Sequence, residues 1–207
     1  MAPLPSIDLP AAAQEQLLGI ARQALDYAVA NGDRLSIDLG TLPACLHRTL
    51  GVFVTLTAAD DLRGCIGTLQ SADPLALAVV DAAHGAALRD PRFQQVQVDE
   101  LPTMRIEISV LSELQPIEAA DREALLATLR PNTDGLLLED GSRRATFLPK
   151  VWEQLPDADH FLDHLLAKAG LTPGHWSPGI AMYTFNQFAH YRCYLSYSAH
   201  VQLTNKT

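Results

Sequence analysis

A short segment around residue 65 combines the residue types that could support thiol chemistry. Residues 62–67 read LRGCIG, so Cys65 follows Arg63 by two positions and has Gly64 before it and Gly67 shortly after it. Glycine frees the backbone for the close approach of another group and leaves the thiol uncrowded. Cys65 is therefore a candidate catalytic nucleophile, redox thiol or metal ligand, and Arg63, which shares its face in a regular strand, could favour the thiolate. The alternative is that Cys65 is a small core residue.

A catalytic thiol also needs a general base, and the sequence offers two candidates. Among seven histidines, His84 is favoured by its order along the chain, although a lone histidine in a helix is more often structural. Glu107 lies on the polar side of an alternating segment and becomes a general-base candidate if that side lines a cleft. If it does not, the glutamate faces solvent in the ordinary way.

Arg92 is a charged residue without an obvious packing duty, and it lies in the sequence DPRF at residues 90–93. An arginine beside a cleft forms a planar, bidentate receptor for a carboxylate or phosphate, so Arg63 and Arg92 could together bind an anionic ligand. Gly64 and Gly67 would let that ligand approach the backbone. The alternative is that Arg92 pairs with Glu107 or another carboxylate and holds two parts of the fold together.

The motifs of common cofactor and metal sites are missing from the sequence. It has no GxxxxGK[ST] loop, no GxGxxG after a strand and no GxSxG elbow. Cys45, Cys65 and Cys193 form no CxxC pair, and His160 and His164 lack the HExxH arrangement. We therefore predict no metal site, no disulfide framework and no cofactor.

Composition and charge narrow the classes of partner. The chain has 207 residues, of which 48% are hydrophobic and 19% are charged, and its formal net charge is −9. A field of this sign disfavours non-specific binding to nucleic acid and to anionic membranes. Specific RNA recognition would need the central arginines to form a contiguous patch. With no apolar run near the roughly 20 residues of a membrane span and no signal-peptide pattern, the cytoplasm is the expected location.

The periodicity of apolar residues predicts alternating helices and strands. Helices are expected over 10–30, 73–89, 121–129 and 159–169, and strands over 52–57, 62–69, 104–111, 136–138, 144–148 and 180–185. Strands that cluster in hairpins between helices are typical of an α+β fold, here an antiparallel or mixed sheet with flanking helices.

Residues 62–67 resemble the signature of the AMMECR family, whose prokaryotic members are called AmmeMemoRadiSam system protein A. Further matches follow in chain order at 86–87, 90–93, 100–101, 106–111, 129–131, 134–135, 143–149 and 151–153. The resemblance covers residues 18–183 and implies one AMMECR-type domain over residues 1–185, with two unequal lobes and a cleft near a loop at residues 63–67. Residues 186–207 match nothing and are expected to form a C-terminal tail.

The resemblance supplies no established reaction and leaves open whether the protein is an enzyme. It implies a Memo-like protein and a radical-SAM protein as partners. The leading hypothesis is an enzyme or enzyme component that binds an anionic small molecule, or a modified nucleotide or protein group, with Cys65 as the reactive residue and Arg63 and Arg92 as anion receptors. The alternative is a non-catalytic adaptor or binding component that docks one of those partners. Specific RNA binding is a third hypothesis.

Overall fold

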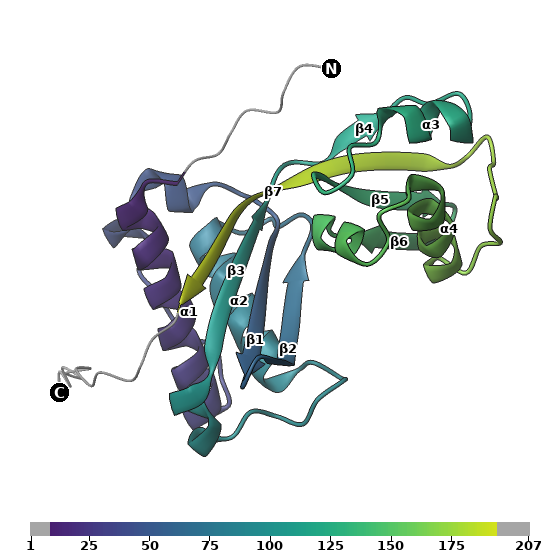
Figure 1. Ribbon diagram of the computed structural model, residues 1–207. Coiled ribbons are helices and arrows are strands. Elements are labelled where there is room, and N and C mark those ends of the chain that lie inside the picture. The colour runs from purple at the N-terminus through teal and green to yellow at the C-terminus, as the bar shows by residue number, and fades with distance from the viewer. Residues whose placement is uncertain (1–8, 194–207) are drawn as a thin grey trace, which may run out of the picture. The chain divides into compact units, whose positions relative to one another are not determined.

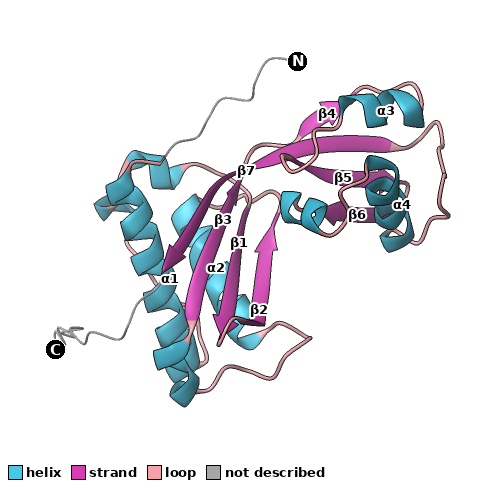
Figure 2. Cartoon of the chain, viewed as in Figure 1, coloured by secondary structure: helices cyan, strands magenta, loops and turns pink. Residues whose placement is uncertain are grey.

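The computed structural model describes residues 9–193, which divide into two compact units. Of the described residues, 9–108 and 190–193 form the N-terminal unit, and 109–189 form the C-terminal unit. Two long strands, β3 (Arg105–Leu111) and β7 (Ala181–Cys193), run from one unit into the other along the chain. Helices and strands are coloured by type in Figure 2.

The N-terminal unit combines two helices with a sheet of strand order β2-β1-β3 (Figure 1). Its elements are α1 (Ala11–Asn31), β1 (Val52–Ala58), β2 (Asp61–Thr68), α2 (Leu75–Leu88) and three short 3-10 helices at Leu39–Thr41, Ala44–His47 and Val98–Thr103. Strands β1 and β2 form an antiparallel hairpin, so the two expected strands and their pairing are confirmed. Helix α2 packs against both strands of this hairpin and against α1.

Alternating side chains on β1 build the core of this unit. Val52, Val54 and Leu56 are fully buried, whereas the residues between them are partly exposed. On β2 the corresponding face carries Gly64, and a Cβ added there would collide with the carbonyl oxygen of Ala86 on α2. Glycine at this position therefore allows the helix to lie directly on the strand.

The C-terminal unit is built on antiparallel strands in the order β4-β7-β5-β6. Its further elements are β4 (Gln115–Ile117), α3 (Arg122–Thr128), β5 (Asp134–Asp140), β6 (Arg143–Phe147), a 3-10 helix at Pro149–Glu153 and α4 (Ala158–Lys168). At the centre of its core Trp152 stacks on Phe161, with ring centroids 3.7 Å apart and both side chains fully buried.

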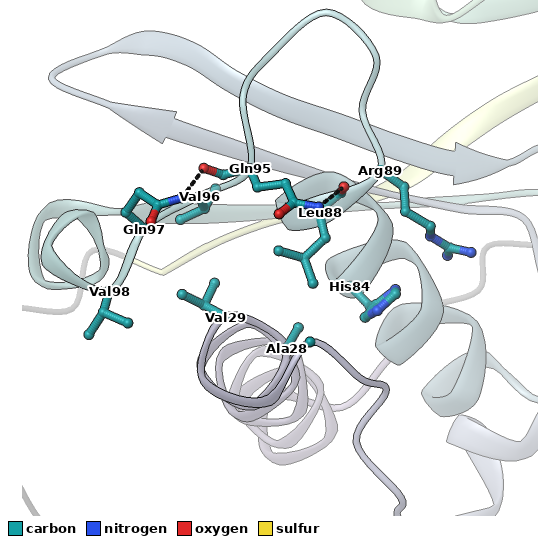
Figure 3. A pocket seen from close by; sticks show the side chains of 10 residues that line it. Ala28, Val29, His84, Leu88, Arg89, Gln95, Val96, Gln97 and Val98 are labelled. Carbon is teal, nitrogen blue, oxygen red and sulfur yellow. Dashed lines mark hydrogen bonds between the residues drawn. The ribbon is translucent and has the colours of Figure 1, made fainter.

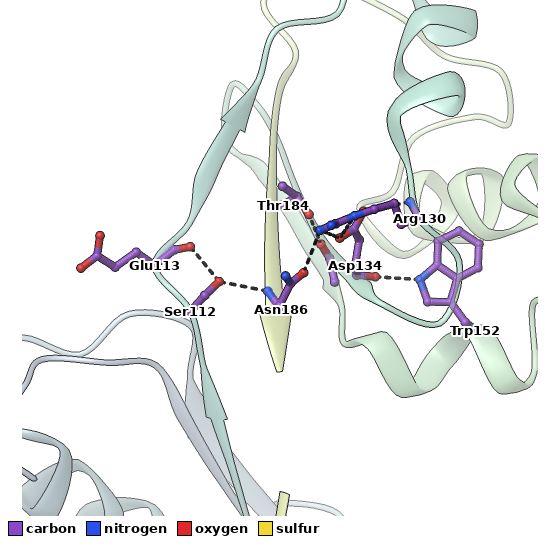
Figure 4. A network of polar contacts seen from close by, with 8 residues as sticks. Ser112, Glu113, Arg130, Asp134, Trp152, Thr184 and Asn186 are labelled. Carbon is purple, nitrogen blue, oxygen red and sulfur yellow. Dashed lines mark hydrogen bonds and ion pairs between the residues drawn. The ribbon is translucent and has the colours of Figure 1, made fainter. Parts of the chain in front are cut away.

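A network of polar contacts joins the core residue Trp152 to Asp134 and Arg130 (Figure 4). The buried carboxylate of Asp134 accepts hydrogen bonds from the backbone N–H of Arg130 at 2.8 Å and from its guanidinium at 2.7 Å, which raises the pKa of Arg130 above its ordinary value. The indole N–H of Trp152 donates to the carbonyl oxygen of Asp134 at 2.7 Å. Ser112 accepts from the backbone N–H of Asn186 at 3.0 Å. Residues 130–135, which carry part of the family resemblance, therefore position the core of this unit.

The α+β class, the antiparallel pairing and the division into two lobes are confirmed. Strand β4 and the 3-10 helices were not expected from periodicity, because each is too short to show a repeat. The expected last strand is longer than predicted and continues to Cys193, past the predicted domain end at residue 185. Of the predicted tail over residues 186–207, the part from residue 194 lies outside the described residues. No helix within residues 9–193 has the length and apolar character needed to cross a membrane.

Candidate functional site

The LRGCIG segment lies entirely within β2, so it is part of a strand and does not form the loop that the resemblance implied. The strand contains one irregularity at Arg63. Thr57 pairs with Leu62 and Leu56 pairs with Gly64, which leaves Arg63 without a partner on β1. An extra residue of this kind is a β-bulge, which redirects the side chain at that position.

Arg63 uses its guanidinium to hold the chain segment that follows α2. It forms a bidentate pair with Glu100, with Nε–Oε1 and Nη2–Oε2 distances of 2.7 and 3.0 Å, and this holds the pKa of Glu100 below its ordinary value. It also donates to the carbonyl oxygens of Gln94 and Gln95 at 2.7 and 3.2 Å. Its side chain is 17% exposed, so protein acceptors occupy the group that was expected to bind a ligand.

Strand β2 is an edge strand of the N-terminal sheet, and the turn after α2 covers its open side at Cys65. The backbone N–H of Cys65 donates to Asp90 Oδ2 at 2.8 Å, and the carbonyl oxygen of Cys65 accepts from Arg92 Nη2 at 3.2 Å. Two side chains thus satisfy the backbone groups that a neighbouring strand would otherwise pair with. The LRGCIG and DPRF motifs are therefore parts of one structural site.

Asp90 and Arg92 form a tight ion pair at this site. Arg92 donates to the carboxylate through Nε at 3.0 Å and through Nη2 at 2.7 Å, while the Asp90 side chain is 2% exposed and that of Arg92 is 53% exposed. The hydrogen bond from Arg92 holds the pKa of Asp90 far below its ordinary value, against the opposing effect of burial, and the N–H of Cys65 lowers it further. Asp90 is thus a buried charge with a full set of donors. Arg92 therefore pairs with a carboxylate two residues away in its own segment, whereas the alternative expected its ion pair to hold two parts of the fold together.

The thiol of Cys65 has two polar neighbours. Its Sγ accepts a hydrogen bond from Thr55 Oγ1, which lies opposite on β1, at 3.3 Å. The guanidinium of Arg92 reaches the same residue through Nη2, which donates to the carbonyl oxygen of Cys65 at 3.2 Å, and the pKa of Arg92 is raised chiefly by its hydrogen bond to Asp90. A hydroxyl donor and a guanidinium are partners that stabilise a thiolate. The cation beside Cys65 is therefore Arg92, whereas the sequence pointed to Arg63.

The two glycines of the motif serve packing. Gly64 lies under Ala86, and a Cβ on Gly67 would lie 2.6 Å from the ring of Phe53 and 2.5 Å from its Cα. The Phe53 ring therefore covers Gly67 on the face of the sheet that carries Cys65. Neither glycine leaves space over its Cα for a ligand.

The two general-base candidates lie on opposite sides of the sheet. His84 is on α2, the helix that packs on the face carrying Gly64, whereas Cys65 points to the other face. The structure thus does not bring His84 to the thiol. Glu107 alternates with the buried Ile106 and Ile108 on β3, so its side chain lies on the same face as Cys65. Within residues 9–193 no cluster of three or more His, Cys, Asp or Glu side chains could hold a metal ion.

Three residues of this site were not selected by sequence reasoning: Thr55, Asp90 and Glu100. Asp90 and Glu100 do lie in segments that resemble the family, which was the available signal. Thr55 carried no such signal, because the bulge at Arg63 decides which residue of β1 lies opposite Cys65.

Comparisons with known proteins agree with the resemblance. The family described as AMMECR1 matches residues 18–189. A protein of Methanothermobacter thermautotrophicus is 36% identical over 171 residues, which cover 82% of this chain and 88% of the relative, and a protein of Methanosarcina mazei is 39% identical over 169 residues, which cover 80% and 84%. The crystal structure of an uncharacterised protein from Pyrococcus horikoshii superposes with a TM-score of 0.78 at 31% identity and covers 86% of this chain and 90% of that one. The chain therefore belongs to the AMMECR1 family.

Proposed function

We propose that this protein is an enzyme or enzyme component in which Cys65 is the reactive group. The observation that carries this proposal is the environment of the thiol. Sγ accepts a hydrogen bond from Thr55 Oγ1 at 3.3 Å, the carbonyl oxygen of the same residue accepts from the guanidinium of Arg92 at 3.2 Å, and Cys65 is partly exposed. Nucleophilic cysteines have polar and cationic neighbours of this kind together with access from solvent, whereas a structural cysteine is enclosed by apolar atoms.

The substrate class follows from the donors beside the thiol. Arg92 is 53% exposed, and its Nη1 has no protein acceptor among the residues that the structure describes. Because Asp90 balances the charge of Arg92, an anion would be held by directed N–H groups and not by net positive charge. We propose a small anion, or the anionic part of a modified nucleotide or protein group, as the ligand of Arg92. Glu107, on the same face of the sheet, is the proposed general base.

The wider setting is proposed from the family resemblance. In this proposal the protein works with a Memo-like protein and a radical-SAM protein in the cytoplasm. Its functional domain is proposed as residues 1–185 together with the continuation of β7, because the AMMECR1 match extends to residue 189. Co-purification of tagged full-length protein with those two proteins would test this part separately from the chemistry of Cys65.

The test of the thiol proposal is site-resolved alkylation. Folded protein is treated with iodoacetamide at neutral pH, and the modified sites are read by mass spectrometry. Cys45 is the internal control, because it is also a free, partly exposed cysteine. We expect Cys65 to react several-fold faster than Cys45, and Thr55→Val and Arg92→Gln to reduce this difference. If Cys65 reacts only when the protein unfolds, the proposed role of Cys65 is wrong.

One observation favours the adaptor as the second candidate. Arg63, Gly64 and Gly67 are all engaged in packing or ion pairing within the N-terminal unit, so most of the motif has a structural purpose. An adaptor would retain partner binding when Cys65 is replaced by serine, whereas a thiol enzyme would lose its reaction. The specific RNA hypothesis finds less support, because Arg92 and Arg105 pair with carboxylates and offer little free positive charge to phosphates.

A further inference from the structure

A pocket lies between α1, α2 and the segment that precedes the 3-10 helix at Val98–Thr103, and Cys65 is not among its lining residues (Figure 3). Its volume is about 420 Å³, which is within the range of small-molecule sites. Figure 3 shows His84 and Arg89 at one end of the pocket, Gln97 and Val98 at the other, and Leu88 between the two ends. The pocket thus has a polar end and an apolar wall.

The polar end belongs to one stripe of α2. Most residues of this helix are buried. The partly exposed positions include Asp81, His84 and Leu88, which follow one another at helical spacing and therefore lie on one side of the helix. Arg89, just after the helix, folds back two turns and pairs with Asp81 at 3.0 Å. A Cβ on the neighbouring Gly85 would lie 2.8 Å from Ile66 Cγ2 and 3.3 Å from Arg89 Nη2, so glycine there mainly accommodates the strand residue Ile66.

The charge at this end is positive although the whole chain is acidic. Asp81 Oδ1 accepts from both Arg34 Nη1, at 2.9 Å, and Arg89 Nη2, at 3.0 Å, so one carboxylate serves two guanidinium groups. Arg89 Nε and Nη1 have no acceptor within the part of the chain that the structure describes. Both arginines are about half exposed, at 53% and 52%, and a ligand can reach them.

A buried polar atom at the same end has no partner. Nδ1 of His84 is shielded from solvent and makes no hydrogen bond. A buried polar group without a partner costs folding free energy. Because solvent does not reach this atom, a ligand in the pocket would meet another edge of the imidazole ring, and the open N–H groups of Arg89 are the features that point to a ligand.

Arg63 of the LRGCIG motif, together with its partner Glu100, holds the opposite wall of the pocket in place. Arg63 binds the carbonyl oxygens of Gln94 and Gln95, and Glu100 accepts the backbone N–H of Gln97 at 2.7 Å. Gln95 in turn donates through Nε2 to the carbonyl oxygen of Leu88 at 3.3 Å. Arg63 therefore positions the backbone of this wall, although its own side chain does not line the pocket.

We propose that this pocket binds a small molecule with one carboxylate and a short apolar body. The carboxylate contacts Arg89 and the imidazole of His84, and the apolar part lies against Val29 and Leu88. The site is independent of Cys65, which points to the other face of the sheet. It gives the protein a binding function besides the proposed thiol chemistry.

The experiment is an NMR titration of full-length protein with hexanoate, which follows the methyl groups of Val29 and Leu88 and the ring of His84. The neutral probe is 1-hexanol, and inorganic phosphate is the probe without an apolar part. We expect hexanoate to shift all three residues and to bind about tenfold more tightly than either other probe, the factor typical of one charge-assisted hydrogen bond.

Variants separate this site from non-specific binding. Arg89→Gln and His84→Phe should each weaken hexanoate about tenfold and leave 1-hexanol unchanged. The matched control is Arg144→Gln, because Arg144 is also about half exposed, at 55%, and paired with a carboxylate at 2.9 Å. Cys65→Ser should bind as the wild type does, which keeps this test apart from that of the thiol. Equal binding of hexanoate and 1-hexanol, or hexanoate binding that survives both pocket variants, would overturn the proposal.

Discussion

The backbone N–H of Cys65 donates to the buried carboxylate of Asp90 at 2.8 Å, across 25 residues of sequence. The same carboxylate holds Arg92, which donates back to the carbonyl oxygen of Cys65 at 3.2 Å. This closed set of contacts positions the thiol and the guanidinium relative to each other. It also makes the stability of the N-terminal unit depend on one ionised carboxylate.

Asp90→Ala should be strongly destabilising. The substitution leaves the N–H of Cys65 and the guanidinium of Arg92 without their shared acceptor, and we expect a loss of about 2–4 kcal/mol in the free energy of unfolding. Urea denaturation followed by circular dichroism measures it. Glu139→Ala, which removes the partner of the exposed Arg144, is the control and should cost about 0.5 kcal/mol or less. Equal effects of the two substitutions would contradict the structural role of Asp90.

The contribution of Asp90 should disappear in acid. Its pKa in the folded protein is held well below the ordinary value of 3.8, so ionised Asp90 stabilises the fold above that value. Below it the unfolded chain takes up a proton that the folded chain resists, and the stability falls as the pH drops towards the folded pKa. The free-energy difference between wild type and Asp90→Asn should be constant from about pH 8 to about pH 5 and shrink below about pH 4. A difference that does not change down to about pH 2 would contradict this linkage.

Gly64→Ala should prevent the close packing of α2 on β2. The added methyl group meets the carbonyl oxygen of Ala86, which is backbone and cannot move without the helix, so we expect a loss of about 3 kcal/mol or a failure to fold. Gly19→Ala is the matched control. Gly19 lies inside α1 with nothing near the position of a Cβ, and alanine there should stabilise by about 0.5–1 kcal/mol. Thermal unfolding of the two variants distinguishes a packing effect from a general glycine effect.

The Arg63–Glu100 pair should show measurable coupling. Its side chains are 17% and 29% exposed and meet in bidentate geometry, whereas the Arg34–Asp81 pair is 53% and 42% exposed. A double-mutant cycle with Arg63→Gln and Glu100→Gln should give a coupling energy of about 1–2 kcal/mol, against about 0.5 kcal/mol or less for Arg34→Gln and Asp81→Asn. Coupling no larger than that of the exposed pair would mean that Arg63 does not hold the segment after α2.

The LRGCIG motif alone indicated where the site lies but not how its residues are used. The turn between β1 and β2 has Ala59 and Asp60 at φ angles of 50° and 70°, and it sets the pairing of Ala58 with Asp61. Continued without interruption, that register would place Cys65 opposite Val54. The bulge at Arg63 shifts it by one residue, so that Thr55 lies opposite Cys65.

Sequence patterns were enough to predict the α+β class, the main helices and strands, the first hairpin and the family. These follow from local periodicity and from residue order, which need no knowledge of contacts between distant segments. The contacts between distant segments were needed to find that Arg92 and not Arg63 contacts Cys65, that Gly64 and Gly67 serve packing, and that His84 lines a pocket away from Cys65. Each of these findings depends on which distant backbone or side chain approaches the LRGCIG motif. A single bulge or one closely packed helix changes those contacts and leaves no periodic signal in the sequence.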